Sequence, residues 1–159
     1  MSQVLITQYL AQLDRLQKIG GTSRETVVRE AFKDLFKAWG KQHDLTFIPE
    51  YEFSTSAKDL RFVDGALVHE LRVPYGYWEA KDVDDDIDKA IATKLKRGYP
   101  KDNIIFENSA HAVLIQDREE VMRCDVRDVK PLEKLLKLFF GYERPAIAEF
   151  RKAVEQFKL

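Results

Sequence analysis

Two apolar segments in the middle of the chain constrain its fold most, because each carries charged residues at defined positions of a strand pattern. Asp64 lies within the first segment, and Glu79 and Lys81 lie at alternate positions of the second, residues 75–81. Side chains alternate between the two faces of a β-strand. Glu79 and Lys81 therefore point to one face, while Trp78 points to the opposite, apolar face.

If the two strands are neighbours in a sheet, Asp64, Glu79 and Lys81 converge on one spot. Two carboxylates can hold a hard cation such as Mg²⁺ through oxygen ligands, with the lysine placed beside a metal-bound water. This trio is typical of a Mg²⁺-dependent phosphodiesterase. The alternative is a solvated strand face on which Glu79 and Lys81 have no catalytic role. Because the strand is aromatic and compact like an interior strand, its charged residues need either a mutual ion pair or a metal.

Composition limits the kind of protein. The chain has 159 residues, of which 45% are hydrophobic, which predicts one domain over residues 1–159 with a sizeable core. No apolar run has the length of a membrane-spanning helix and the N-terminus lacks a signal-peptide pattern, so no membrane association is expected. The lone Cys124 allows no internal disulfide, which fits a reducing cytoplasm.

Several chemistries are excluded by what the sequence lacks. The histidines at 43, 69 and 111 have no zinc-site spacing with Cys124, and no Walker A loop or Rossmann fingerprint occurs. We therefore expect no small-molecule cofactor on this domain. The net charge of −1 argues against a free-standing, high-affinity DNA binder. Any nucleic-acid contact must be local or supplied by another domain. This suggests that the chain is one module of a larger assembly.

Hydrophobic periodicity predicts helices at both ends of the chain and strands between them. An antiparallel helix pair is expected over about residues 3–18 and from a capping box at 22–25 to a stop at Gly40. Strands follow at about 45–53, interrupted by Pro49, then at 60–67 and 75–81. A helix over 84–97, with Asp84–Asp86 as its N-cap region, precedes strands at 103–106, 112–115 and 121–124. The last helices are expected from Pro131 to a stop at Gly141 and over about 145–157. This order predicts an α/β domain with a central mixed β-sheet flanked by helices.

Residues 75–83, followed by 86–88, resemble the PD-(D/E)XK nuclease superfamily. More narrowly, they resemble the Mrr-like N-terminal nuclease domain of single-polypeptide (type ISP) restriction-modification enzymes, in which a Gly-Tyr-aliphatic-Glu-x-Lys-Asp strand leads into an acidic helix start. Residues 25–29 resemble the family's early-helix Glu-x-x-x-Arg. Residues 94–99 and 103–106 resemble its helix-end Gln-x-x-Arg-Tyr and the Asn-aliphatic strand that follows.

The likeness covers roughly residues 20–125 and has three departures. Val63 stands where a Pro commonly precedes the metal-binding Asp, Lys94 stands near the expected Gln, and Gly98 interrupts the Arg-Tyr pair. These departures affect accessory positions and leave Asp64 and the Glu-x-Lys core unchanged. The resemblance implies a PD-(D/E)XK, restriction-endonuclease-like fold.

The resemblance also implies roles for individual residues. Asp64 and Glu79 would be metal ligands, with the Ala80 backbone carbonyl as a third oxygen. Lys81 would orient or deprotonate the attacking water, or stabilise charge on the pentacovalent phosphate. The implied metal is Mg²⁺, for which Mn²⁺ would substitute. Glu25 would reach the same metal or simply close the capping box, with Glu30 as the alternative acid on that helix.

The implied partner is double-stranded DNA. The domain would serve a restriction-modification enzyme whose helicase and methyltransferase modules carry translocation, target recognition and methylation, and its last helix would lead into a coupler. Basic residues near the end of the 84–97 helix either contact DNA phosphates or form a solvated helix end; they are Lys94, Lys96, Arg97 and Lys101.

Two other functions remain open on the sequence. The first is a stand-alone PD-(D/E)XK nuclease of the resolvase or repair type, which would need its own DNA surface. The second is a non-catalytic interaction domain of the same fold, in which Asp64, Glu79 and Lys81 form a buried ion-pair network. Metal binding distinguishes this domain from a nuclease.

Overall fold

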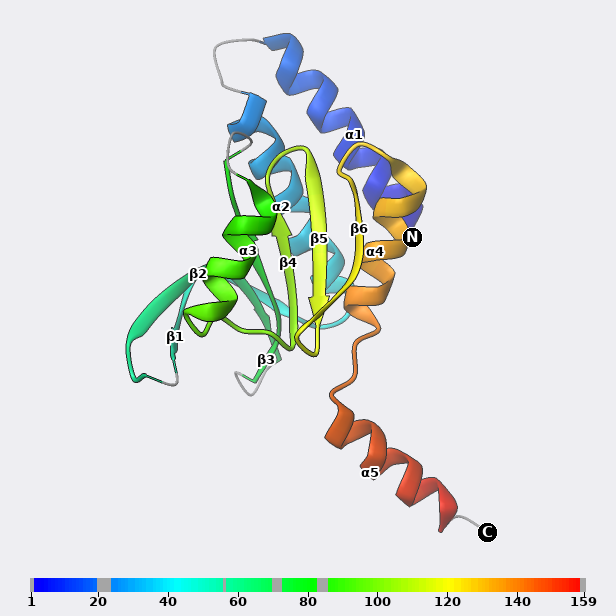
Figure 1. Cartoon of the computed structure of the whole chain (residues 1–159). Coiled ribbons are helices and arrows are strands. Elements are labelled where there is room, and N and C mark those ends of the chain that lie inside the picture. The colour runs from blue at the N-terminus through cyan, green and yellow to red at the C-terminus, as the bar shows by residue number, and fades with distance from the viewer. Residues whose placement is uncertain (1, 20–23, 56, 70–72, 83–85, 158–159) are drawn as a thin grey trace.

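The structure, a computed structural model, describes residues 2–19, 24–55, 57–69, 73–82 and 86–157 (Figure 1). The helices in these ranges are α1 (Ser2–Ile19), α2 (Arg24–Gln42), α3 (Ile87–Lys96), α4 (Val129–Phe140) and α5 (Pro145–Gln156). The strands are β1 (Thr46–Ser54), β2 (Leu60–Val68), β3 (Pro74–Ala80), β4 (Asn103–Glu107), β5 (His111–Gln116) and β6 (Glu119–Asp125).

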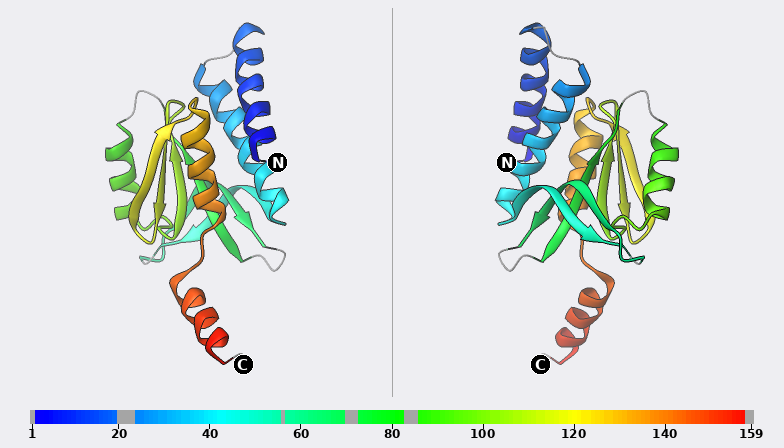
Figure 2. Two further views of the ribbon diagram at one scale, coloured as in Figure 1. Left: turned by 90° about the vertical axis from the view of Figure 1, so that its right-hand side faces the viewer. Right: turned by 90° about the vertical axis from the view of Figure 1, so that its left-hand side faces the viewer.

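The strands form one mixed sheet in the spatial order β1-β2-β3-β4-β5-β6. β3 and β4 are parallel, and all other neighbours are antiparallel. A parallel pair needs a crossover connection rather than a hairpin, and α3 provides it. Figure 2 shows α3 on one face of the sheet and α1, α2 and α4 on the other. The predicted α/β architecture with a central mixed sheet is confirmed.

Two apolar layers hold the helices against the sheet. The larger one joins α1, α2 and α4 to one sheet face and includes Phe32, Trp78 and Phe139. The smaller one lies under α3, where Ile91 packs with side chains of the opposite sheet face, and Tyr77 packs against it. β3 is therefore covered on both faces, which explains its aromatic composition.

The boundary predicted at Gly40 is wrong, because α2 continues to Gln42. Gly40 serves a packing role instead: a Cβ atom there would lie 2.6 Å from a methyl group of Leu67 on β2. The glycine allows the helix backbone to approach the sheet closely. The predicted stop at Gly141 is confirmed, since this residue is the C-cap of α4.

The predicted break at Pro49 is also wrong, because β1 runs without interruption from Thr46 to Ser54. β1 is an edge strand with β2 as its only neighbour in the described sheet, and proline is tolerated at an edge because its missing N–H is not needed there. α4 begins at Val129, two residues before Pro131. The capping box at 22–25 falls largely outside the described residues, as do Asp84 and Asp85.

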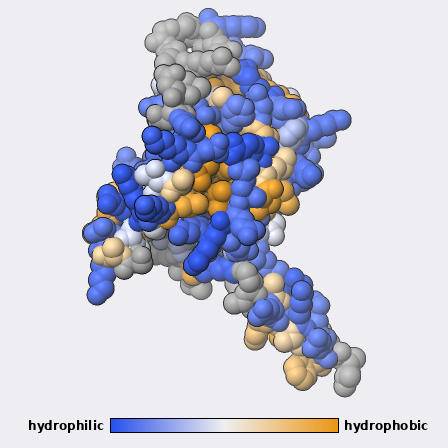
Figure 3. Space-filling model, in the orientation of Figure 1, coloured by the Kyte–Doolittle hydropathy of each residue, from blue (hydrophilic) through white to orange (hydrophobic). Residues whose placement is uncertain are grey.

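α5 extends away from the sheet and from the other helices (Figures 1 and 2). Its Phe150, Val154 and Phe157 are 71%, 41% and 85% exposed, and Figure 3 shows apolar surface on this helix. Within the described residues, no helix combines the length and apolar character required to span a membrane.

Candidate active site

The hydrogen-bonded ladder between β2 and β3 ends at the pair Gly65 and Trp78, and side chains take over beyond it. The Ala80 backbone N–H donates to Asp64 Oδ2 over 2.7 Å, and the Asp64 backbone N–H donates to Glu79 Oε1 over 3.0 Å. Each carboxylate thus accepts a hydrogen bond from the opposite strand. The structure therefore brings the two acids together, as their positions on neighbouring strands predict.

Glu79 is 3% exposed and contacts two lysines through the same oxygen. Its Oε2 lies 3.6 Å from Lys81 Nζ and 3.2 Å from Lys94 Nζ on α3. Lys94 also donates to the Tyr99 hydroxyl over 3.1 Å, and its ammonium lies 4.4 Å from the centre of that ring. The Tyr99 hydroxyl in turn donates to the Phe62 carbonyl on β2, 3.1 Å away. Lys94 therefore extends from α3 to Glu79 on β3 and is linked through Tyr99 to the backbone of β2.

Burial and mutual charge shift the pKa values of this cluster. Burial raises the pKa of Glu79 and the nearby Asp64 adds to this, against the opposing effect of the lysines. Burial lowers the pKa of Lys81, and the positive charge of Lys94 adds to this against the effect of Glu79. Burial also acts to lower the pKa of Lys94, but Tyr99 and Glu79 outweigh it and leave that pKa raised. Lys81 thus gives up its proton more readily than Lys94.

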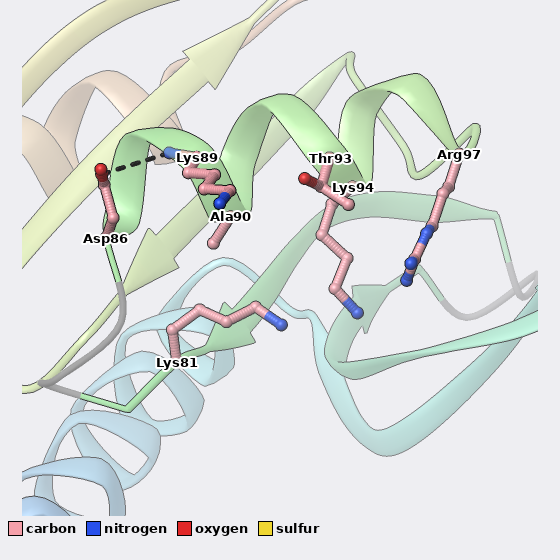
Figure 4. A pocket seen from close by; sticks show the side chains of 7 residues that line it. All are labelled: Lys81, Asp86, Lys89, Ala90, Thr93, Lys94 and Arg97. Atoms are coloured by element: carbon pink, nitrogen blue, oxygen red, sulfur yellow. Dashed lines mark hydrogen bonds between the residues drawn. The ribbon is translucent and has the colours of Figure 1, made fainter.

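A groove of about 520 Å³ opens beside these residues, between α3 and the end of β3 (Figure 4). It is lined by Lys81, Asp86, Lys89, Ala90, Thr93, Lys94 and Arg97. The six positions on or next to α3 (86, 89, 90, 93, 94 and 97) lie three or four residues apart from one helical turn to the next, so they form one face of the helix. Asp86 accepts hydrogen bonds from the backbone N–H groups of Asp88 and Lys89, which confirms its predicted place at the helix start.

The groove is lined by some of the predicted DNA contacts and not by others. Lys94 and Arg97 line it, whereas Lys96 and Lys101 are not among its lining residues. Lys89 lines it but was missed by sequence reasoning, although it lies eight residues before Arg97 and therefore close to the same helix face. The helical period applied to residue 97 would have found it.

The helix acid is not placed by the structure, because the side chain of Glu25 lies outside the described part of α2. Glu30 is exposed and pairs with Lys33 over 3.3 Å. Arg29 Nη2 lies 3.2 Å from Asp82 Oδ1, which ties α2 to the residue that follows Lys81. The turn of α2 that precedes Arg29 is therefore anchored near the end of β3.

The carboxylate oxygens of Asp64 and Glu79 suit a hard, partly hydrated cation. Among the described residues no three His, Cys, Asp or Glu side chains converge as a metal site, so Asp64 and Glu79 are a pair. Mg²⁺ commonly uses one or two carboxylates and takes its remaining ligands from water and substrate phosphates. Asp64 is exposed, and its Oδ1 makes no hydrogen bond within the described structure, so it can face such an ion. The pair therefore fits Mg²⁺.

Comparison with known proteins finds similarity among solved structures. No protein-family model and no curated protein sequence matches the chain. A chain in the cryo-EM structure of a DrdV–DNA complex superposes with a TM-score of 0.88 and is 43% identical, and the match covers 98% of this chain. The fold is restriction-endonuclease-like. The chain spans only 15% of the length of that matched chain.

Proposed function

We propose that this chain is a Mg²⁺-dependent DNA endonuclease domain of the PD-(D/E)XK superfamily, of the Mrr-like kind. The observation that carries the proposal is the pair of carboxylates at the end of the β2–β3 ladder. Glu79 of this pair contacts Lys81, and Lys81 lines a groove together with two further lysines and an arginine. The similar chain was solved in a complex with DNA, which supports DNA as the partner here.

Each residue has a part in phosphodiester hydrolysis under this proposal. Asp64, Glu79 and the Ala80 carbonyl would hold the metal, which polarises a phosphoryl oxygen and lowers the pKa of bound water. Lys81, whose pKa burial lowers, would orient the attacking water or accept its proton. In its charged form it would instead stabilise the negative charge that builds on the phosphate. Lys89 and Arg97 would hold neighbouring phosphates in the groove.

The domain would work as part of a larger enzyme. The matched chain is several times longer than this one, and the net charge of −1 gives this chain no overall attraction to DNA. Target recognition, translocation and methylation would accordingly reside in helicase and methyltransferase modules outside these residues. One such site cuts one strand, so a double-strand break needs two copies or successive nicks.

A non-catalytic role is favoured by one observation, the ion pairs that Glu79 makes with Lys81 and Lys94. Such a network satisfies a buried carboxylate without a metal. The exposed Asp64 argues for a ligand-facing site, because a structural ion pair has no need of a second acid open to solvent. Metal binding and cleavage separate the two functions.

The decisive variant is Lys81→Ala, assayed by nicking of supercoiled plasmid in the polypeptide that carries this domain. We expect the rate to fall by about 10³-fold or more with the fold intact, because the lysine acts mainly on the transition state. Lys81→Arg should not restore the rate, since a planar guanidinium presents its charge differently. Lys134→Ala, at an exposed position of α4, is the matched control. Unchanged nicking by Lys81→Ala would refute the proposed nuclease.

A further inference from the structure

The geometry points to Lys94 as a displaceable counter-ion built into the metal site. It neutralises Glu79 while no cation is bound, and it leaves for a DNA phosphate when the metal takes over. This inference rests on the proposed function, but it concerns the order in which metal and DNA bind rather than the chemistry of cleavage.

The first support is the way Lys94 is held. Its ammonium is closer to Glu79 Oε2 than that of Lys81, 3.2 Å against 3.6 Å. It comes from α3, across the groove from β3, and the Tyr99 hydroxyl fixes it from a third side over 3.1 Å. The side chain is 18% exposed. Lys94 is thus a specific partner of Glu79 rather than a surface lysine that happens to lie nearby.

The second support is that Lys94 competes with any metal for the same oxygen. Glu79 Oε1 accepts the Asp64 backbone N–H, whereas Oε2 is the oxygen that both lysines face. An ammonium and a divalent ion repel each other strongly at such short separations in a buried site. A metal that binds Glu79 must therefore push Lys94 away or bind weakly.

The third support is that the groove offers Lys94 somewhere to go. Lys94 lines the groove together with Lys89 and Arg97 (Figure 4). Lysine carries its charge on a flexible four-carbon stem, so a modest rotation of the side chain can turn the ammonium from Glu79 toward a phosphate in the groove. A DNA phosphate there would attract Lys94 and leave Glu79 with a charge for the metal to neutralise.

Coupling of the two ligands follows from this exchange. If a phosphate draws Lys94 off Glu79, DNA raises the affinity for the metal, and by linkage the metal raises the affinity for DNA by the same factor. A neutral side chain at position 94 would remove the competition and the part of the coupling that Lys94 carries, and would leave only the part that comes from phosphate oxygens binding the metal. A purely structural lysine has the opposite signature, because its loss would loosen the site and weaken metal binding.

The test is titration of Mn²⁺ into the wild-type chain, Lys94→Gln and Lys134→Gln, with free Mn²⁺ followed by electron paramagnetic resonance. Without DNA, we expect Lys94→Gln to bind Mn²⁺ several-fold more tightly than wild type, and Lys134→Gln, which loses the same charge on the opposite side of the sheet, to match wild type. Adding a short phosphorothioate duplex at low salt should tighten Mn²⁺ binding to wild type by a larger factor than to Lys94→Gln. Equal or weaker Mn²⁺ binding by Lys94→Gln without DNA overturns the proposal.

Two further variants keep the result of the titration interpretable. Lys94→Met is a second neutral variant if Lys94→Gln does not fold, and the same tightening is expected. Asp64→Ala reports on the site itself. If its Mn²⁺ binding equals that of wild type, the proposed metal site is absent and the nuclease proposal fails. If binding depends on Asp64 but not on Lys94, only the counter-ion proposal fails.

Discussion

Asp64 accepts a hydrogen bond from the neighbouring strand and is proposed to bind the metal, and one substitution tests both roles. Its Oδ2 accepts the Ala80 backbone N–H, and the residue as a whole is exposed. Asp64→Ala should abolish the heat of binding millimolar Mn²⁺, and removing the hydrogen bond should cost about 1 kcal/mol of stability. Mn²⁺ should raise the melting temperature of the wild type modestly, because the ion relieves repulsion between the carboxylates. Equal calorimetric heats for wild type and Asp64→Ala would show that the proposed metal site is absent.

Glu107 makes the stability depend on pH. This carboxyl is fully buried beside Trp78, and burial raises its pKa to about 7, against the effects of the Ser109 N–H, Trp78 and Arg29. Because the folded-state pKa lies above the unfolded one, the stability that Glu107 contributes is complete below pH about 4.5 and is lost as pH rises through about 7. The loss is on the order of 3 kcal/mol by pH 8, from about 1.4 kcal/mol per unit of pKa shift.

Glu107→Gln should remove much of this dependence, since the amide oxygen can still accept the Ser109 N–H. The measurement is urea unfolding at pH 5.5 and pH 8 for wild type, Glu107→Gln and Glu149→Gln, the last being an exposed acid on α5. We expect the variant to lose less stability than wild type between the two pH values. An equal loss in all three proteins would show that Glu107 does not titrate in this range.

At the scale of elements, α3 is the surface that DNA would meet. Lys89 and Arg97 lie on its groove-lining face, eight residues and therefore about 12 Å apart along the helix axis. The double substitution Lys89→Gln and Arg97→Gln should weaken DNA binding by the domain and reduce the slope of log affinity against log salt by roughly two. Lys96→Gln should change both much less, because that lysine does not line the groove. Fluorescence anisotropy with a labelled duplex at several salt concentrations measures both quantities.

The local sequence pattern predicted most of the helices and strands, but it did not predict where they end. Strand alternation placed Glu79 and Lys81 on one face and made Asp64 their neighbour, because consecutive strands usually pair. Gly40 and Pro49 were misread as breaks, because a close approach to Leu67 and a place at the sheet edge decide their roles. Both are tertiary facts that a local pattern does not contain.

The same limit applies to the site. The sequence predicted Lys94 either at a DNA phosphate or in a solvated helix end. Its contact with Glu79 requires α3 to cross over the sheet so that residues 15 positions apart meet. The position of the crossover helix depends on how Ile87 and Ile91 pack under it, which sequence periodicity indicates only as an apolar face. The strand-borne half of the site was therefore predictable, and the helix-borne half was not.

For the whole molecule, the balance of charge limits its affinity for DNA. The chain has 26 basic and 27 acidic residues, whereas the groove is lined by three lysines, one arginine and one aspartate. The isolated chain should bind random duplex DNA poorly at about 150 mM salt, and cleavage should require tethering to a DNA-bound module, which replaces affinity by effective concentration. Nanomolar binding by the monomeric chain in a titration with random duplex would favour the stand-alone nuclease instead.

α5 should contribute little to the stability of the rest. Its apolar side chains are exposed, and Glu143 and Arg151, which form an ion pair over 2.7 Å, are among the contacts that link it to the preceding segment. Ending the chain after Arg144 should shift the melting temperature by no more than about 2 °C, the size expected for surface changes in a domain of this length. A shift beyond about 5 °C in differential scanning fluorimetry would show that α5 packs on the core.

The open sheet affects how the protein aggregates in solution over time. A sheet that does not close offers two edges to which another polypeptide can add a strand, a common start of irreversible aggregation. Pro49 interrupts the donors of the β1 edge, and the β6 edge alternates charged side chains such as Glu119, Arg123 and Asp125. Both edges therefore carry residues that oppose the addition of a strand. The exposed apolar surface of α5 belongs to a helix and offers no strand edge. Copies of this chain should therefore cluster through reversible helix contacts rather than through fibrils.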